Sequence, residues 1–106
     1  MQDRLVYTGM IHPLPTYTIV TKRMQSRIDR HRLLQRHHHV LETRVLATRQ
    51  RDPESAELVD LYDQLLDLER DAATLDREIA HICDAELQRR NQRGMRLYRD
   101  STPVET

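Results

Sequence analysis

The 106-residue chain has no Phe or Trp, only one Cys and two Gly, and no long apolar run. Without large aromatic side chains, a compact globular core of this size is difficult to fill. The single thiol, Cys83, excludes a disulfide and a cysteine-based zinc site within the chain, and its place beside Ile82 predicts a small buried residue. No segment approaches the roughly 20 apolar residues that span a bilayer. The N-terminus lacks a signal-peptide pattern, so we expect a cytoplasmic or virion-internal protein with no membrane contact.

The charged residues, 32% of the chain, divide unevenly along it. Residues 1–51 hold ten basic and three acidic side chains, whereas residues 52–106 hold seven basic and fourteen acidic ones. Opposite charge on two segments favours their antiparallel pairing, although each exposed pair contributes only about 0–1 kcal/mol.

Residues 53–93 give the clearest helical pattern. Asp52 and Pro53 are typical of a helix start, with Asp as the N-cap and Pro in the first helical position. Apolar residues then recur at steps of three and four, at Leu58, Leu61, Leu65, Leu68, Ala72, Leu75, Ile79 and Ile82. Gly94 is expected to end the helix in a left-handed conformation.

Residues 17–50 contain neither Gly nor Pro and predict a first helix, capped by Thr16 or Thr18. The stripe expected to face the other helix is called the seam here. It is less apolar than that of the second helix and comprises Val20, Met24, Arg27, His31, Leu34, His38, Leu41, Val45 and Thr48. A second, broken apolar surface lies beside or away from it, at Ile28, Leu33, Val40 and Leu46.

Together the patterns predict an all-α fold, a two-helix antiparallel coiled-coil-like hairpin over residues 17–94. An extended N-terminal arm (1–16) precedes it and a C-terminal tail (95–106) follows. A short connection around Arg51 sets the expected register, in which His38 faces Leu65.

The N-terminal arm is extended because of its two Pro, yet it is rich in apolar residues. The candidates for binding a protein partner are Leu5, Val6, Tyr7, Met10, Ile11 and Leu14. Two alternatives stay open: the arm folds back onto the hairpin, or it lies on a partner's surface.

Two basic clusters are expected to merge at the hairpin end away from the turn. The first helix supplies Lys22, Arg23, Arg27 and Arg30, and the second supplies Arg89, Arg90, Arg93, Arg96 and Arg99. Such a patch suits phosphate groups or an acidic protein surface.

The run His37-His38-His39 is not expected to hold a metal, because successive helical positions point about 100° apart. Glu78 and His81 have the Glu-x-x-His spacing of di-iron bundles, but the expected register supplies no further Glu from the facing helix. We therefore predict no metal, no cofactor and no catalytic residue.

The predicted function is a non-enzymatic structural or adaptor subunit that binds protein partners or neighbouring subunits in a homo- or hetero-oligomer. Viral or phage particles and multi-subunit complexes are examples of such assemblies. One alternative is a small nucleic-acid-associated protein that uses the basic end of the hairpin. Another is a helical inhibitor or modulator that docks in a groove of another protein.

Overall fold

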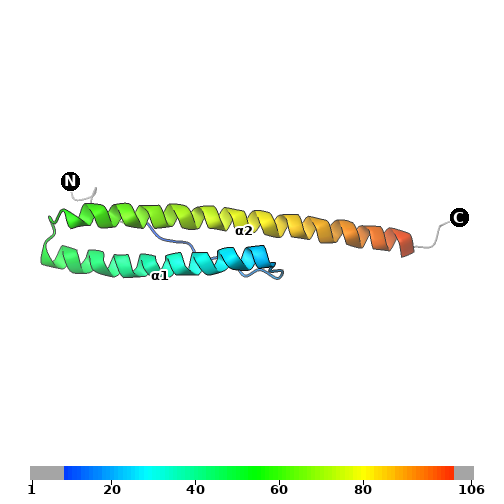
Figure 1. The fold of residues 1–106 in the computed structure, drawn as a ribbon, viewed down its shortest axis with the longest axis horizontal. Coiled ribbons are helices and arrows are strands. Elements are labelled where there is room, and N and C mark those ends of the chain that lie inside the picture. The colour runs from blue at the N-terminus through cyan, green and yellow to red at the C-terminus, as the bar shows by residue number, and fades with distance from the viewer. Residues whose placement is uncertain (1–8, 102–106) are drawn as a thin grey trace.

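The computed structural model describes residues 9–101 of the chain, with side chains described as far as Arg93. It contains two helices, α1 (Lys22–Arg51) and α2 (Glu57–Ser101), which lie antiparallel (Figure 1). The molecule is a rod with extents of 81 × 26 × 16 Å. The predicted all-α helical hairpin is confirmed.

The helix α1 begins later than predicted. Its N-cap is Thr21, whose Oγ1 accepts a hydrogen bond from the backbone N–H of Met24 at 3.2 Å. Thr16 and Thr18, the predicted caps, lie instead in the extended segment before the helix. The reason is that Leu14 and Tyr17 of this segment pack against the core in an extended conformation, so the helix begins only after them.

The connection between the helices is longer than predicted. Asp52 ends α1, because its N–H donates to the carbonyl of Thr48, and its carboxylate accepts from the N–H of Glu54. The Ser55 hydroxyl accepts from the N–H of Glu57, where α2 starts. The prediction that Asp52 caps the second helix is therefore wrong.

This five-residue connection, 52–56, still brings predicted neighbours together. Met24 and Ile79, which the predicted register pairs, lie in one cluster, and His31 and Ala72 line one cavity. Nε2 of His38 lies 2.9 Å from Oε2 of Glu69, one helical turn along α2 from the predicted Leu65.

The predicted end of the second helix is also corrected. α2 continues through Gly94 to Ser101, and no described Gly has a positive φ. A Gly inside a helix costs only about 1 kcal/mol relative to Ala, and the neighbouring Arg, Gln, Met and Leu residues are good helix formers. The helix therefore extends well beyond the start of α1 (Figure 1).

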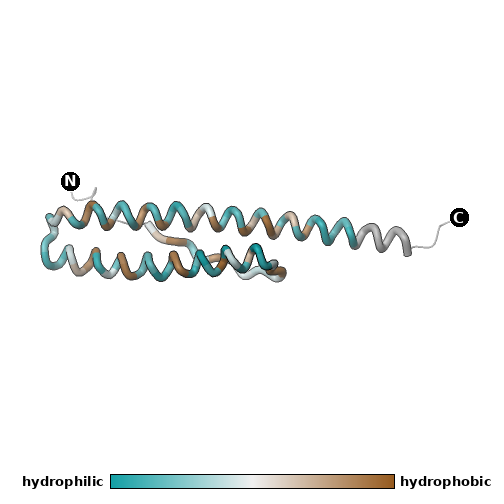
Figure 2. The backbone as a smooth tube through the Cα atoms, in the orientation of Figure 1, coloured by the Kyte–Doolittle hydropathy of each residue, from teal (hydrophilic) through white to brown (hydrophobic). Residues whose placement is uncertain are grey.

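Apolar segments recur along both helices between hydrophilic ones (Figure 2) and form the core in two clusters. The cluster near the turn comprises Leu41, Val45, Leu58, Leu61, Leu65 and Leu68. The second, near the start of α1, comprises Met24, Ile28, Ile79 and Cys83. The predicted leucine seam of α2 is buried from Leu58 to Ile79, and Cys83 is buried as expected.

The seam of α1 matches the prediction at most positions, with two corrections. Ile28 is buried in place of the predicted Arg27, which is partly exposed and reaches across to Glu78 of α2. Val20 precedes the helix and is exposed. His31 and His38 are buried in the seam as predicted, so polar side chains interrupt the core.

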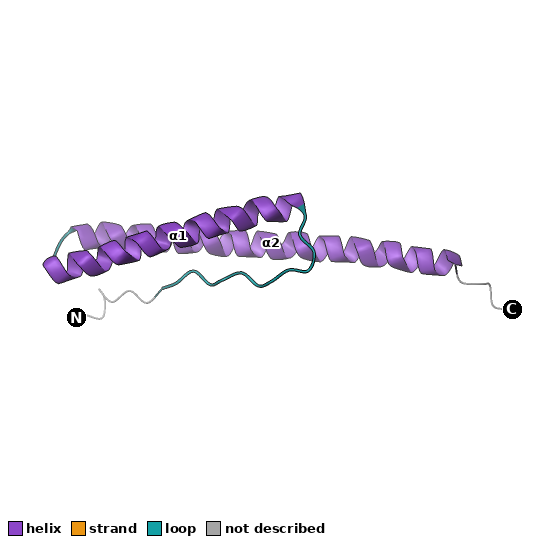
Figure 3. Cartoon of the chain, turned by 90° about the horizontal axis from the view of Figure 1, so that it is seen from below, coloured by secondary structure: helices purple, strands orange, loops and turns teal. Residues whose placement is uncertain are grey.

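The segment before α1 forms a third layer. Figure 3 shows this loop running beside both helices. Ile11 packs against the cluster near the turn, while Leu14 and Tyr17 pack against the second cluster. A thin two-helix core leaves one side of its apolar residues uncovered, and this segment covers part of that side.

Candidate functional site

The predicted partner-binding arm lies on its own hairpin over the part that the structure describes. Ile11 and Leu14 are partly buried against the core, so of the two alternatives the arm takes the first. Met10 keeps 57% of its surface exposed and remains available to a partner. The predicted residues Leu5, Val6 and Tyr7 lie outside the described residues.

A cavity of about 180 Å³ lies beneath the arm. His31 lines it with 1% of its surface exposed, and its Nδ1 has no hydrogen-bond partner. Burial lowers the pKa of His31 below its ordinary value of 6.5, and the charge of Asp76 offsets part of this shift. The imidazole is therefore held neutral under the arm, because a buried cation without a partner is costly.

A second buried histidine joins the helices. Nε2 of His38 lies 2.9 Å from Oε2 of Glu69, and its Nδ1 lies 3.4 Å from Oε1 of Glu42. Burial raises the pKa of Glu69 above its ordinary value of 4.5. A neutral imidazole donates to only one carboxylate, whereas the imidazolium donates to both. This triad links α1 to α2 through the core.

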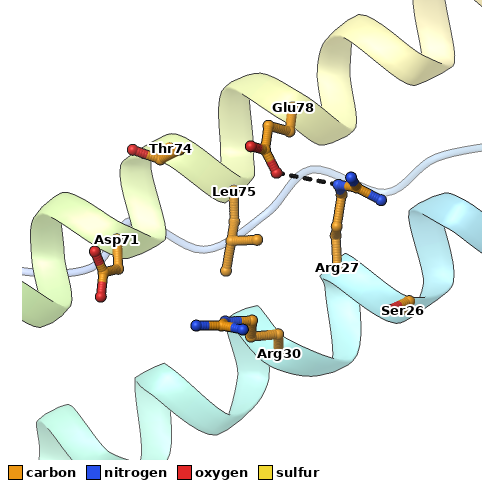
Figure 4. Close-up of a pocket in the computed structure, with 7 residues that line it drawn as sticks. All are labelled: Ser26, Arg27, Arg30, Asp71, Thr74, Leu75 and Glu78. Atoms are coloured by element: carbon orange, nitrogen blue, oxygen red, sulfur yellow. Dashed lines mark hydrogen bonds and ion pairs between the residues drawn. The ribbon is translucent and has the colours of Figure 1, made fainter.

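The groove on another side of the hairpin holds charged side chains from both helices. It is a hollow of about 420 Å³ in which Nε of Arg27 donates to Oε1 of Glu78 at 3.0 Å (Figure 4). Arg30 and Asp71 line the same hollow, with Leu75 between the acidic residues. An exposed ion pair of this kind contributes only about 0–1 kcal/mol. The charges in the groove therefore add little stability and mainly favour the alignment of α1 with α2.

The predicted basic patch is divided in the structure. Arg27 and Arg30 face the groove between the helices, whereas Arg89, Arg90 and Arg93 lie on the part of α2 beyond α1. Lys22 and Arg23 are exposed at the start of α1, nearest to that part. The side chains of Arg96 and Arg99 lie outside the described part of the structure.

Glu86 organises the arginines next to it. Its carboxylate accepts from Arg89 at 2.8 Å and from Arg90 at 3.0 Å. The Arg90 hydrogen bond holds the pKa of Glu86 below its ordinary value, against the effect of burial, and the charges of the three neighbouring arginines act with it. One carboxylate is thus shared by two guanidinium groups, which leaves a net positive charge.

An outer stripe on α2 is a feature that the sequence analysis missed. Its residues recur at intervals of seven, at Val59, Leu66, Ala73, Ala80 and Leu87. The three larger side chains keep 56%, 48% and 39% of their surface exposed. The interval of seven between these residues is the signal in the sequence that would have found the stripe.

An outer stripe on α1 corresponds to the predicted broken apolar surface. Leu33, Val40 and Leu46 are 58%, 56% and 60% exposed, and only Ile28 of that group is buried. Both helices thus bury one apolar side and present another to the outside. Apolar side chains aligned along one side of a helix are the anchors by which an amphipathic partner helix binds.

Among residues 9–101, no three His, Cys, Asp or Glu side chains gather in a way that would hold a metal ion. Within the same range, neither helix has the length and hydropathy needed to cross a membrane. No family model, curated protein or solved structure matches the chain.

Proposed function

We propose that this chain is a non-enzymatic structural or adaptor subunit that binds protein partners in a larger assembly. The observation that carries the proposal is the pair of outer stripes, one on each helix, whose large apolar side chains are about half exposed. The core of the hairpin is already filled by the seams, so these side chains are not needed for its own packing. Their burial against a partner releases roughly 25 cal/mol for each Å² of apolar surface.

The geometry of the rod supports the same proposal. In a coiled coil, residues repeating every seven positions follow one side of a helix as it supercoils. The arm lies near the middle of the α2 stripe, at Ala73, and the large side chains on either side of it stay exposed. The stripe of α2 keeps that spacing from Val59 to Leu87. A partner with an amphipathic helix is the kind that such a surface fits.

The test compares variants of the two stripes with a matched control in the cells from which the protein comes. The stripe variants are Leu33→Asp/Val40→Asp on α1 and Val59→Asp/Leu66→Asp on α2. The control is Gln50→Asp/Gln64→Asp, which adds the same charge at exposed polar positions of α1 and α2. Circular dichroism of each purified chain verifies that the helices remain.

Size-exclusion chromatography of the cell extract, with detection of the tagged chain, gives the result. We expect the wild type and the control to elute in an assembly ahead of the free chain, and at least one stripe variant to elute as the free chain. If the wild type itself elutes as the free chain, or if both stripe variants elute with it in the assembly, the proposal is wrong.

A further inference from the structure

The last part of α2 has no α1 beside it. Met24 and Ile28 pack with Ile79 and Cys83, which brings the start of α1 near residue 85 of α2. From Glu86 to Ser101 the helix continues alone (Figure 1). At 1.5 Å per residue this part, called the overhang here, is about 24 Å long.

The residue types change where α1 stops. As far as Cys83, the side of α2 that faces α1 is apolar, but the positions that continue it are Glu86, Arg89 and Arg93. Residues 57–86 contain ten acidic residues and two Arg, whereas residues 87–101 contain five Arg and one Asp. α2 becomes hydrophilic beyond the start of α1 (Figure 2).

This change indicates the chemistry of the partner. A helix that docks on protein needs apolar anchors, and Leu87 is the one large apolar side chain that the structure describes on the overhang. Arg89, Arg90 and Arg93 are exposed, and Arg93 has no ion pair within the described part of the chain. Guanidinium groups on a helix without an apolar seam suit phosphate oxygens, which they bind in pairs of hydrogen bonds.

We infer that the overhang binds double-stranded DNA, with its helix against the major groove and its arginines on the phosphates. The major groove of B-DNA admits one α-helix, and a single helix that continues out of a coiled coil is one established way to enter it. Gln88, Asn91 and Gln92 are exposed beside the arginines, and their amides are suited to hydrogen bonds with phosphates or base edges. The acidic part of α2 repels the duplex, so it orients the rod away from the DNA axis.

This DNA site uses other residues than the outer stripes, so it is independent of the proposed protein binding. The test uses the full chain and a labelled duplex of about 20 base pairs, with fluorescence anisotropy measured between about 50 mM and about 200 mM salt. The overhang variant is Arg89→Gln/Arg93→Gln. The matched control is Arg36→Gln/Arg49→Gln, which removes the same charge at exposed positions of α1.

We expect the wild type to bind the duplex at the lower salt concentration and to lose affinity steeply as salt is added. The overhang variant should bind about tenfold more weakly, with a salt slope smaller by about two, while the control changes affinity less than about twofold. Helicity by circular dichroism should be the same in all three proteins.

Three results would overturn the inference. The first is no binding by the wild type at the lower salt concentration. The second is an equal loss in the overhang and control variants, which would indicate attraction by charge alone. The third is binding of an acidic polyglutamate peptide in place of the duplex, which would make the partner an acidic protein.

Discussion

His38 of α1 and Glu69 of α2 meet across the core, with Nε2 2.9 Å from Oε2 and side chains that are 6% and 17% exposed. Replacing His38 with Leu leaves a mostly buried carboxylate without this partner, so we expect a loss of about 1–3 kcal/mol in the free energy of unfolding. Replacing both residues with Leu removes the unsatisfied group and should recover much of the loss. Urea unfolding followed by circular dichroism measures both; a double variant less stable than the single one would contradict this role.

The stability of the hairpin should fall as pH decreases through the ordinary pKa of histidine. Because burial holds the pKa of His31 below 6.5 in the folded chain, the unfolded chain takes up the proton first as pH falls, and stability is lost. Charged or titratable groups near it are His12 on the arm, Arg32 on α1, and Glu69, Asp76 and Arg77 on α2.

The measurement is the free energy of unfolding between about pH 8 and about pH 5.5. The difference between the wild type and His31→Leu should shrink or change sign as pH falls. Glu69 acts in the opposite direction at lower pH: its pKa is raised, so its contribution is fully present below 4.5 and is lost as pH rises through its pKa in the folded chain. A constant difference between the two proteins over this range would show that His31 has no part in the pH dependence.

Two neighbouring leucines of α2 should respond very differently to truncation. Leu65 is fully buried, whereas Leu66 is 48% exposed on the outer stripe. We expect Leu65→Ala to cost about 2–5 kcal/mol because it leaves a cavity, and Leu66→Ala to cost about 0.5 kcal/mol or less in the isolated chain. If Leu65→Ala and Leu66→Ala lost similar stability in urea unfolding, α2 would face α1 with a different side from the one in the structure.

The arm should protect the only thiol of the chain. Leu14 and Tyr17 pack against the cluster that contains Cys83, which is 8% exposed. Leu14→Ala/Tyr17→Ala should therefore increase the labelling rate of Cys83 by roughly tenfold or more, since the arm then opens more often. Thr18→Ala, at an exposed position of the same segment, is the control and should leave the rate unchanged.

A substitution at Gly94 tests whether this residue lies inside α2 or ends it. Because α2 continues through it with no left-handed turn, Gly94→Ala should favour the helical form of the overhang by about 0.5–1 kcal/mol. Backbone chemical shifts of residues 90–101 report this local change. A decrease in their helical character would mean that Gly94 ends the helix in solution.

The parts of the fold that follow from periodicity could be predicted from the sequence. The apolar residues of α2 alternate at three and four, and this pattern identified the seam from Leu58 to Ile79. At its end the pattern predicts Ile82, whereas the structure buries Cys83 and leaves Ile82 partly exposed. The seam of α1 could not be assigned by periodicity alone, because Arg27 and Ile28 are adjacent and either fits the same position. There the structure buries the apolar residue.

The helix ends could not be predicted in this way, because they depend on single residues with more than one suitable role. Asp52 is a good N-cap, but its N–H instead closes α1 and its carboxylate accepts from the turn. Thr16 or Thr18 was predicted to cap α1, but the packing of Leu14 and Tyr17 keeps both threonines in the arm, and Thr21 caps the helix instead. The outer stripe of α2 was missed because a period of seven is hidden beside a stronger seam.

The unequal lengths of α1 and α2, 30 and 45 residues, give the rod two different ends. The blunt end is a short connection containing Asp52 and Glu54, and the tapered end is one arginine-bearing helix. A rod with two different ends is polar. A surface that recognises either tip therefore fixes which way every bound copy points, and an array built from such rods inherits that polarity without further contacts.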